Sequence, residues 1–329
     1  MKKMLTLIGL ILCVSQVSCD TQSSLTESEL VEKIIVSEED VNGTLQLFIR
    51  DIDGLNPTQL TFNSNKSWMP AISPNGKKIA YVEESNVSAD IYLINIDGTE
   101  NQLLTSGGIN ITPVWTPDGN HILYTHTPTL NGTIPQRIFI MEANGFNKTA
   151  LINETGNYSE VVPTISPDGS QVAFASDRSG HDQFEIWKAN FDGANLTQLT
   201  TIGYDSIIQA NIQQKVPSWS PDGSKIALWR GVEMNELNQD GSLRDQLIVQ
   251  SWKVCVMNTD GTELTAIDFG DDPAWSTDGQ YIYHPDPMNR DQNPNNAISI
   301  KKHRPNGSDN ITLFKTTRGF GRMDVGFIE

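Results

Sequence analysis

The sequence has little positive charge, few cysteines and few histidines. Lysine and arginine number 23 against 40 aspartate and glutamate residues, which gives a formal net charge of −17. Phosphate backbones and anionic lipids are recognised by clustered positive charge, so this balance excludes a nucleic-acid binder and a protein held on acidic lipid by charge. Charged residues make up only 19% of the chain and hydrophobic residues 37%, so an acidic disordered chain is excluded as well.

Cysteine is too scarce to supply a disulfide framework. Of the three cysteines, Cys13 and Cys19 lie near the N-terminus, and Cys255 stands alone in the apolar run 254–256. We expect no intrachain disulfide in the mature protein, so packing must hold the fold together. Cys255 is interpreted as a small buried hydrophobic residue and not as a nucleophile.

The N-terminus has the features of a signal peptide. Lys2 and Lys3 precede an apolar stretch, 4–14, that is too short to span a bilayer. The segment 14–20 resembles the processing box of bacterial lipoproteins, with Gln16 where that box usually has leucine. A cleavable lipoprotein signal is therefore expected, and ordinary secretory cleavage is the alternative.

Processing at this box divides the chain into three parts. Residues 1–18 are expected to be removed, Cys19 to carry the lipid and 19–32 to form a polar linker before a single domain at 33–329. The protein is then predicted to lie on the periplasmic side of the cell envelope, anchored by the lipid, with secretion as the alternative. Asp20 resembles an inner-membrane retention signal of enteric bacteria, but the choice between inner and outer membrane stays open.

Two turn patterns repeat along the chain. The first has a proline, an apolar residue and a Ser/Thr-x-Asp/Asn-Gly turn, and a β-rich run follows it; the copies are Pro70–Gly76, Pro113–Gly119, Pro163–Gly169, Pro217–Gly223 and Pro273–Gly279. The second has a β-rich run and an Asp/Asn-Gly pair, with leucine or isoleucine six residues after the glycine; the copies are Gly54–Leu60, Gly98–Leu104, Gly145–Leu151, Gly193–Leu199, Gly261–Ile267 and Gly307–Leu313.

The chemistry of these turns predicts hairpins. Proline presets φ, aspartate or asparagine favours the next turn position, and glycine accepts the positive φ that closes the turn. Each repeat should therefore hold four short antiparallel strands, named a to d in chain order, with the first pattern as the a–b turn and the second as the c–d turn. Four strands in about 45 residues are typical of a propeller blade.

The two ends of the chain complete the ring. Residues 33–37 match a b strand that leads into a c strand at Leu45, and 323–328 end the chain where an a strand belongs. We therefore predict an all-β fold, a six-bladed β-propeller of four-stranded antiparallel blades, closed by pairing of the C-terminal strand with the N-terminal strands. Such closure removes exposed sheet edges.

The repeats resemble the WD-like β-propeller repeat of the TolB family. The resemblance is carried by Pro-Ser-Trp-Ser-Pro-Asp-Gly-Ser-Lys-Ile-Ala at 217–227 and by Asp-Gly-Ala-Asn-Leu-Thr-Gln-Leu-Thr at 192–200. TolB itself is a periplasmic protein of the Tol-Pal envelope system with an α/β domain before its propeller. Here only the polar stretch 20–31 separates Cys19 from the first expected strand, so the resemblance implies a TolB-like propeller lipoprotein without that domain.

The lengths of the connections between strands predict where a partner binds. The a–b and c–d turns share one face of the ring, the turn face, and are uniformly tight. The b–c and d–a connections share the opposite face, the loop face, and include long insertions at 231–250 and 285–297. Function on a rigid scaffold usually lies in such connections. The predicted partner contacts on the loop face are Trp68, Tyr158, Tyr204, Trp229, Arg230, Trp252, His284, Arg290, Arg318 and Phe320.

Several of the prominent side chains also have a structural explanation. Trp229 and Trp252 fit ordinary blade packing, and Arg178 belongs to the repeat and would fix a b–c loop. Tryptophan recurs at one position of the a–b pattern and is assigned to the core; these residues are Trp115, Trp219 and Trp275.

Signals for catalysis or for a cofactor are weak. The chain contains no Gly-x-Ser-x-Gly nucleophile elbow. Its five histidines are predicted to fall in separate blades without metal-ligand spacing; they are His121, His126, His181, His284 and His303. No catalytic residue, metal site or cofactor is predicted.

The sequence therefore favours a non-catalytic binding or scaffolding lipoprotein of the cell envelope. Its expected partner is an envelope protein or peptide docked on the loop face, and the protein is expected to be a monomer that meets the membrane only through its lipid. Two alternatives stay open: a carbohydrate-active or hydrolytic enzyme, and a small-ligand sensor, each using the central channel.

Overall fold

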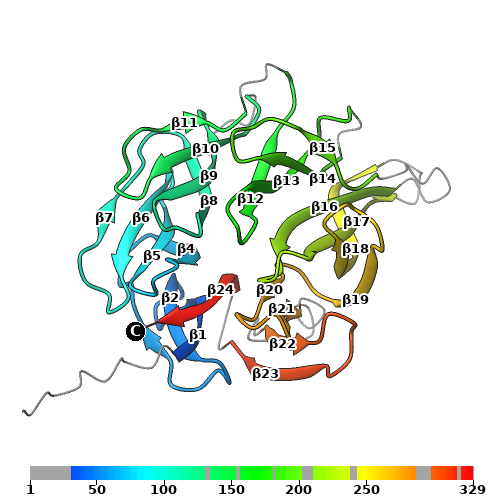
Figure 1. Cartoon of the computed structure of the whole chain (residues 1–329). Helices are drawn as coiled ribbons and strands as arrows, with labels where there is room; N and C mark the ends of the chain where they lie inside the picture. Colours follow the sequence, from blue (N-terminus) through cyan, green and yellow to red (C-terminus); the bar gives the residue numbers. More distant parts are fainter. Residues whose placement is uncertain are drawn as a thin grey trace, which may run out of the picture.

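The structure is a computed structural model that describes residues 31–129, 134–152, 156–180, 183–201, 210–237, 243–286, 298–316 and 320–328. Every regular element in these ranges is a β-strand. The sheets are arranged in a ring around a central axis (Figure 1), so the predicted all-β propeller is confirmed. The predicted signal peptide and Cys19 lie outside the described residues.

The two ends of the chain meet in one sheet. It has the order β24-β1-β2-β3 and consists of β1 (Val31–Glu39), β2 (Leu45–Asp51), β3 (Thr58–Gln59) and β24 (Phe320–Ile328). β24 pairs antiparallel with β1, from Val31 opposite Ile328 to Glu38 opposite Phe320. The predicted closure of the ring by the C-terminal strand is therefore confirmed.

The next sheet along the chain has eight strands. They are β4 (Lys66–Ile72), β5 (Lys78–Glu84), β6 (Ala89–Asn95), β7 (Gln102–Leu103), β8 (Ile109–Trp115), β9 (His121–Thr127), β10 (Arg137–Glu142) and β11 (Thr149–Ala150). Within each half the four consecutive strands pair antiparallel, as hairpins require.

Three four-stranded sheets follow, each in simple sequence order. The first holds β12 (Glu160–Ile165), β13 (Gln171–Ser176), β14 (Glu185–Asn190) and β15 (Thr197–Gln198). The second holds β16 (Ala210–Trp219), β17 (Lys225–Leu237), β18 (Leu243–Asn258) and β19 (Thr265–Phe269). The third holds β20 (Ala274–Trp275), β21 (Ile282–Asp286), β22 (Ser299–His303) and β23 (Ile311–Lys315).

The prediction of six separate four-stranded blades is wrong. Four sheets have four strands each, whereas the fifth has eight because β6 and β8 pair in parallel at Ala89 and Ile109. The side chain of Asn110 reinforces this junction, since its Nδ2 donates to Asp90 Oδ1 at 3.0 Å. Gly108, just before β8, has a φ of +80° that suits glycine and lets the chain enter beside β6. A local junction, and not the turn repeat, joins these strands.

Apolar side chains fill the spaces between neighbouring strands and sheets. The largest fully buried side chains include one aromatic residue from the second strand of several repeats: Tyr81, Tyr124, Phe174 and Tyr283. The three repeat tryptophans Trp115, Trp219 and Trp275 are each 8% exposed, which confirms their assignment to the core. Trp115 also joins the a strands β8 and β4, because its Nε1 donates to the Ala71 carbonyl at 3.0 Å.

The single cysteine in the described part of the chain behaves as predicted. Cys255 on β18 is 1% exposed and packs in an apolar cluster with Trp219 and Leu228. Burial raises the pKa of its thiol to about 11. Such a thiol stays protonated at neutral pH, so the interpretation of Cys255 as a buried hydrophobic residue is confirmed.

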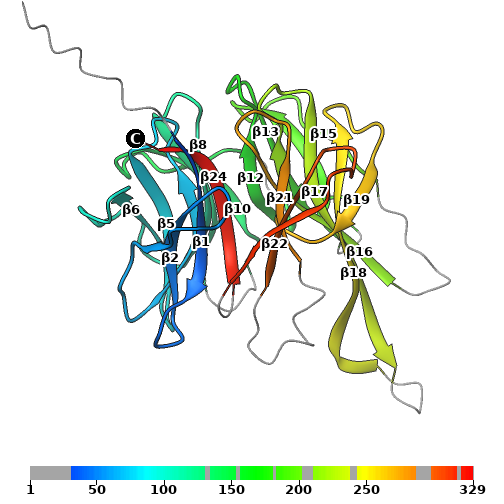
Figure 2. The ribbon, with the colours of Figure 1, turned by 90° about the horizontal axis from the view of Figure 1, so that it is seen from below.

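The predicted loop at 231–250 is largely strand. β17 and β18 remain paired well beyond the ring, from Gly231 opposite Trp252 to Leu237 opposite Leu243. Figure 2 shows this hairpin projecting from the body of the ring, on the side away from the C-terminal end of β24. Alternating apolar and polar residues indicate a strand, and turn patterns alone carry no information about it. No helix capable of crossing a bilayer occurs in the described ranges.

Candidate functional site

The a strands of the sheets line the central channel, which holds a small cavity. Five X-Pro pairs line it together with Met323 and Asp324, around a cavity of about 130 Å³. The residue before each proline has positive φ: Met69 (51°), Thr112 (56°), Val162 (54°), Val216 (55°) and Asp272 (39°). Few non-glycine residues adopt this conformation, and β-branched residues rarely do. At four of the five X-Pro pairs, those in β4, β8, β12 and β16, a shift in strand register accommodates the positive φ.

The closing strand brings one carboxyl group into this channel. By register, Asp324 on β24 takes the position that Val114, Thr164 and Ser218 hold on other inner strands. Its Oδ2 accepts a hydrogen bond from the backbone N–H of Ile72 at 2.7 Å, which ties β24 to β4 of the neighbouring sheet. Burial raises the pKa of Asp324 to about 6, and two backbone hydrogen bonds offset only part of this effect. The turn patterns give no hint of this residue.

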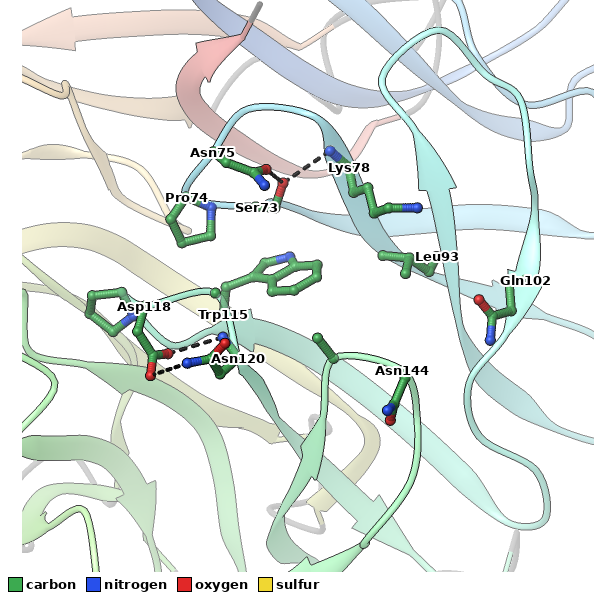
Figure 3. Close-up of a pocket in the computed structure, with 13 residues that line it drawn as sticks. Ser73, Pro74, Asn75, Lys78, Leu93, Gln102, Trp115, Asp118, Asn120 and Asn144 are labelled. Atoms are coloured by element: carbon green, nitrogen blue, oxygen red, sulfur yellow. Dashed lines mark hydrogen bonds between the residues drawn. The ribbon is translucent and has the colours of Figure 1, made fainter.

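A larger pocket opens on the turn face. It has a volume of about 700 Å³ and lies between the two halves of the eight-stranded sheet (Figure 3). The a–b turn after β4, the a–b turn after β8 and the c–d turn after β10 all contribute to its lining. Its size lies within the range of roughly 300–1,000 Å³ usual for ligand pockets, whereas the channel cavity is smaller than that range.

Side-chain amides are the main polar groups of this pocket. Asn75 and Asn120 lie on two sides of the Trp115 ring, whereas Gln102 lies on β7 and Asn144 in the c–d turn after β10 (Figure 3). All four amide residues are exposed, whereas Trp115 is buried beneath them. Local hydrogen bonds use part of their capacity: Asn75 Oδ1 accepts from Ser73 Oγ at 2.8 Å, Asn120 Nδ2 donates to Asp118 at 2.8 Å, and Asn144 Nδ2 donates to Glu142 at 3.0 Å. An amide has two donor hydrogens and two lone pairs, so each still has groups left for a partner that carries both donors and acceptors.

The two charged groups of the pocket are occupied by local contacts. Asp118 Oδ1 accepts hydrogen bonds from Thr116 Oγ1 at 2.6 Å and from the Asn120 N–H at 3.0 Å. These bonds lower the pKa of Asp118 to about 2, so it stays ionised at neutral pH. Lys78 Nζ donates to Asn95 Oδ1 at 3.0 Å. Neither group is placed to exchange a proton near neutral pH, which favours binding over acid–base catalysis.

The same carboxylate arrangement recurs in the other a–b turns. Serine Oγ donates to the aspartate Oδ1 at 2.6 Å in the turns of Asp168, Asp222 and Asp278. In each case this hydrogen bond is the largest cause of a lowered pKa, which for Asp168 falls to about 2. Much of the acidity of the chain therefore serves its turns and does not mark an acidic binding site.

The predicted loop-face contacts are mostly engaged within the fold. Of the ten, the structure describes the side chains of five: Trp229 and His284 are buried, and Trp68, Tyr158 and Arg230 are partly buried. The structure does not gather them into one exposed patch. The other five side chains lie outside the description: Tyr204, Trp252, Arg290, Arg318 and Phe320. Binding on the loop face therefore stays a prediction.

Tyr158 illustrates how these side chains are used. Its ring lies between two guanidinium groups, with Arg137 at 4.7 Å and Arg178 at 4.5 Å from the ring centroid. Arg178 also pairs with the buried Glu160, Nη2 to Oε1 at 2.5 Å. Tyr158 thus packs against a fixed cationic layer beside β12 and β13, which is a structural role.

The prediction that the histidines fall in separate blades is wrong. His121 and His126 both lie on β9, and His284 and His303 lie on the paired strands β21 and β22. The rings of His284 and His303 have centroids 4.8 Å apart. They stand 19 positions apart in the sequence, but a hairpin brings them together, so spacing along the chain does not reveal that they are neighbours. His181 lies outside the described residues.

Known proteins resemble this chain over its repeats. The family model of the TolB beta propeller domain matches residues 31–248. A TolB homologue of Chlorobium luteolum is 26% identical over 152 residues, which cover 46% of this chain and 33% of the relative. The Tol-Pal system protein TolB of Desulfosudis oleivorans is 29% identical over 104 residues, covering 32% and 23%. The matched part of the chain thus spans a third or less of these curated relatives.

A solved structure shows the same fold. TolB from Acinetobacter baumannii superposes with a TM-score of 0.65 at 21% identity, over 89% of this chain and 66% of that protein. At this identity the likeness bears on the fold alone. The family model, in contrast, matches more than half of the sequence. The chain therefore belongs to the TolB β-propeller family.

Proposed function

We propose that this protein is a non-catalytic binding protein of the cell envelope that holds a protein or peptide partner at the turn-face pocket. The observation that carries the proposal is the ring of exposed amides, Asn75, Gln102, Asn120 and Asn144, around a pocket of about 700 Å³. Peptide backbone offers alternating donors and acceptors, which such amides can match. The size suits a short segment of a partner.

The relatives support a partner-binding role in the envelope. One of them is named as a Tol-Pal system protein, and this name supports an envelope role in the proposal. The matched segment covers 23% of that relative, so its role reaches this chain only as part of the proposal. The lipid anchor belongs to the proposal too, since the features that predict it lie before residue 31.

The alternatives that use the channel have less support. A cavity of about 130 Å³ is small for a sugar or a peptide. A glycan site on the turn face would need an open aromatic platform, but Trp115 is only 8% exposed and its Nε1 donates a hydrogen bond to the Ala71 carbonyl. The exposed lining of the pocket offers amides, which suit a peptide better than a stacked sugar ring.

Site-specific photocrosslinking in cells tests the proposal. A photoreactive residue at Gln102, in the pocket, is compared with one at Asn86, an exposed position between β5 and β6 on the loop face. We expect Gln102 to yield a discrete protein adduct and Asn86 to yield none. The paired change Asn120→Ala and Asn144→Ala should reduce the adduct by at least tenfold while the protein level stays constant.

Two results would contradict the proposal. Adducts at Asn86 alone would favour the loop face and the residues that the sequence predicts there. No adduct at either position, with the protein folded and correctly located, would argue against a stable protein partner. Turnover of a glycan by the purified protein would instead support the enzymatic alternative.

The anchor is tested separately. Radiolabelled palmitate should be incorporated into the wild-type protein and not into Cys19→Ser, which should fractionate away from membranes. Labelling that persists in Cys19→Ser would contradict lipidation at this residue and would leave the proposed partner site untouched.

A further inference from the structure

Two buried histidines and an aspartate meet between two sheets. His284 on β21 and His303 on β22 face Asp268 on β19, and one ligand atom from each residue lies within 4.8 Å of the others. Both histidine side chains are fully buried. β19 ends one sheet, and β21 and β22 belong to the next, so the cluster spans the boundary between two sheets.

Backbone contacts fix the proton on each imidazole. His284 Nδ1 lies 3.1 Å from the Pro285 carbonyl, and His303 Nδ1 lies 3.1 Å from the Arg304 carbonyl. A carbonyl oxygen can only accept, so Nδ1 must carry the hydrogen in each ring. In a neutral imidazole this leaves the lone pair on Nε2, and a backbone carbonyl holding Nδ1–H is the usual support of a metal-binding histidine.

The two Nε2 atoms have no hydrogen-bond partner among the described residues. Both are buried, and neither His284 Nε2 nor His303 Nε2 forms a hydrogen bond. The nearest carboxylate oxygen, Asp268 Oδ2, lies 3.5 Å from His284 Nε2. Buried nitrogen lone pairs without a partner are rare in folded proteins and call for an explanation.

The repeat makes these histidines unusual. His284 stands five residues after its turn glycine, where other repeats have an aromatic or aliphatic core residue: Tyr81, Tyr124, Phe174 and Leu228. His303 stands four residues before its turn glycine, where four other repeats have Ile94, Met141, Ala189 and Met257, and the first repeat has Arg50, which pairs with Glu38. Apolar residues therefore suffice for packing at both positions, so packing does not account for the imidazoles.

Neighbouring groups orient the carboxylate. Asp268 accepts hydrogen bonds from its neighbour Phe269 N–H at 2.7 Å and from Asn310 Nδ2 at 2.7 Å. The ammonium group of Lys301 also lies near this carboxylate. Lys301 itself lies closer to Asp286, at 2.8 Å, than to Asp268, at 3.7 Å.

The chain also leaves room for the ring of His284. A Cβ atom on Gly270, just after β19, would overlap His284 Nδ1 and approach the Pro285 carbonyl to 2.8 Å. Any residue other than glycine would therefore displace the ring from its backbone partner. The segment that carries Asp268 thus fits closely around the histidine on the next sheet.

We propose that Asp268, His284 and His303 bind a divalent first-row transition metal, with Zn²⁺ the ion that best fits two imidazoles and one carboxylate. Such a mixed N/O set suits zinc and its neighbours, whereas Mg²⁺ and Ca²⁺ prefer oxygen ligands. Ligand atoms around tetrahedral zinc are about 3.4 Å apart, so binding would draw the three side chains together by about 1 Å. The ion would link the sheet of β16–β19 to the sheet of β20–β23.

Metal uptake by the untagged full chain tests this site. After dialysis against EDTA, the protein is incubated with ZnCl₂ or MgCl₂, and bound metal is measured by mass spectrometry. We expect about one zinc per chain, a rise in melting temperature with zinc and none with magnesium. Co²⁺ should give the visible absorption bands of a tetrahedral N/O site.

Variants taken from the repeat itself provide the controls. His284→Phe and His303→Met restore residue types that other repeats carry at these positions, so both should fold without metal. Each should bind zinc at least tenfold more weakly, and Asn310→Ala should weaken binding by about tenfold by freeing Asp268. His121→Gln removes a histidine of β9 and should bind like the wild type.

Two results would overturn the proposal. One is the absence of zinc uptake and of cobalt bands in the folded wild-type protein. The other is equal uptake by His284→Phe and His303→Met, which would assign the metal to surface sites. If either variant fails to fold, Asp268→Asn replaces it, since it keeps the side-chain shape and should still lower zinc affinity.

Discussion

The regular part of the ring, β4–β15, and its closing part, β19–β24, both hold aspartates in a–b turns, Asp278 among them, but the closing part also places His284, His303 and Asp324 away from the turns. In the regular part, Asp118 and Asp168 lie exposed in a–b turns, and hydrogen bonds lower the pKa of each to about 2. In the closing part, the pKa of Asp324 is raised to about 6 by burial, and two histidines replace apolar core residues. An ionisable residue that follows the repeat serves its turn, whereas one that departs from the repeat needs another reason.

Exchanging residues between the two parts should give the largest change in the free energy of unfolding. Tyr124→His puts an imidazole into the regular part, where the tyrosine is buried among apolar side chains. We expect a loss of about 3 kcal/mol in the free energy of unfolding, because packing is lost and a polar ring is left without partners. The reciprocal change His284→Tyr should cost less than about 1.5 kcal/mol in metal-free protein.

Urea unfolding followed by tryptophan fluorescence measures both changes. Equal losses for Tyr124→His and His284→Tyr would mean that the two positions have the same packing requirement, and the distinction between the two parts would fail. Both proteins should be compared without added metal, so that ligand binding does not alter the stability of either.

Replacing Asp324 should change the free energy of unfolding by an intermediate amount that depends on pH. Its pKa is raised from 3.8 to about 6 in the folded state. The protonated form therefore contributes stability that is fully present below about pH 4 and is lost as pH rises through about 6. Asp324→Asn should match the wild type near pH 4 and be more stable at pH 7.5 by about 1–2 kcal/mol. Unfolding curves at the two pH values show whether the difference appears only at the higher pH.

Replacing a turn carboxylate should change the stability least, and the change should have the opposite pH dependence. Asp168 has its pKa lowered from 3.8 to about 2, so its contribution is present above about pH 4 and is lost as pH falls through about 2. Asp168→Asn should lower the melting temperature slightly at pH 6, and the difference should vanish near pH 2. The effect is small because Asn75 already fills this turn position, accepting from Ser73 Oγ at 2.8 Å. A larger loss at pH 2 than at pH 6 would contradict this reasoning.

The sequence predicts those features of the fold that its turn motifs and repeats determine. Proline, aspartate and glycine at fixed spacing locate the hairpins, and the recurring tryptophans locate the core, since Trp115, Trp219 and Trp275 are all buried. The ends of the chain predict the closure that pairs β24 with β1. These features depend on local backbone chemistry and on repetition, which one sequence contains.

The remaining features depend on contacts between strands. The junction at Ala89 and Ile109 rests on the parallel approach of two strands, which turn spacing does not specify. The turn-face pocket gathers residues from three turns, so no single motif marks it. The repeats do contain a signal for the histidine pair: His284 and His303 stand where most other repeats have an apolar or aromatic residue, and the spacing of histidines along the chain does not reveal it.

The tautomers of these histidines test most directly the claim that the closing part holds ionisable groups for a reason other than packing. Long-range ¹H–¹⁵N correlation spectra of the metal-free protein at pH 7.5 report which ring nitrogen carries the proton. With His284→Phe and His303→Met used for assignment, both rings should carry the proton on Nδ1 and leave Nε2 bare. A proton on Nε2 in either ring would remove the lone pair from the cluster and contradict the account.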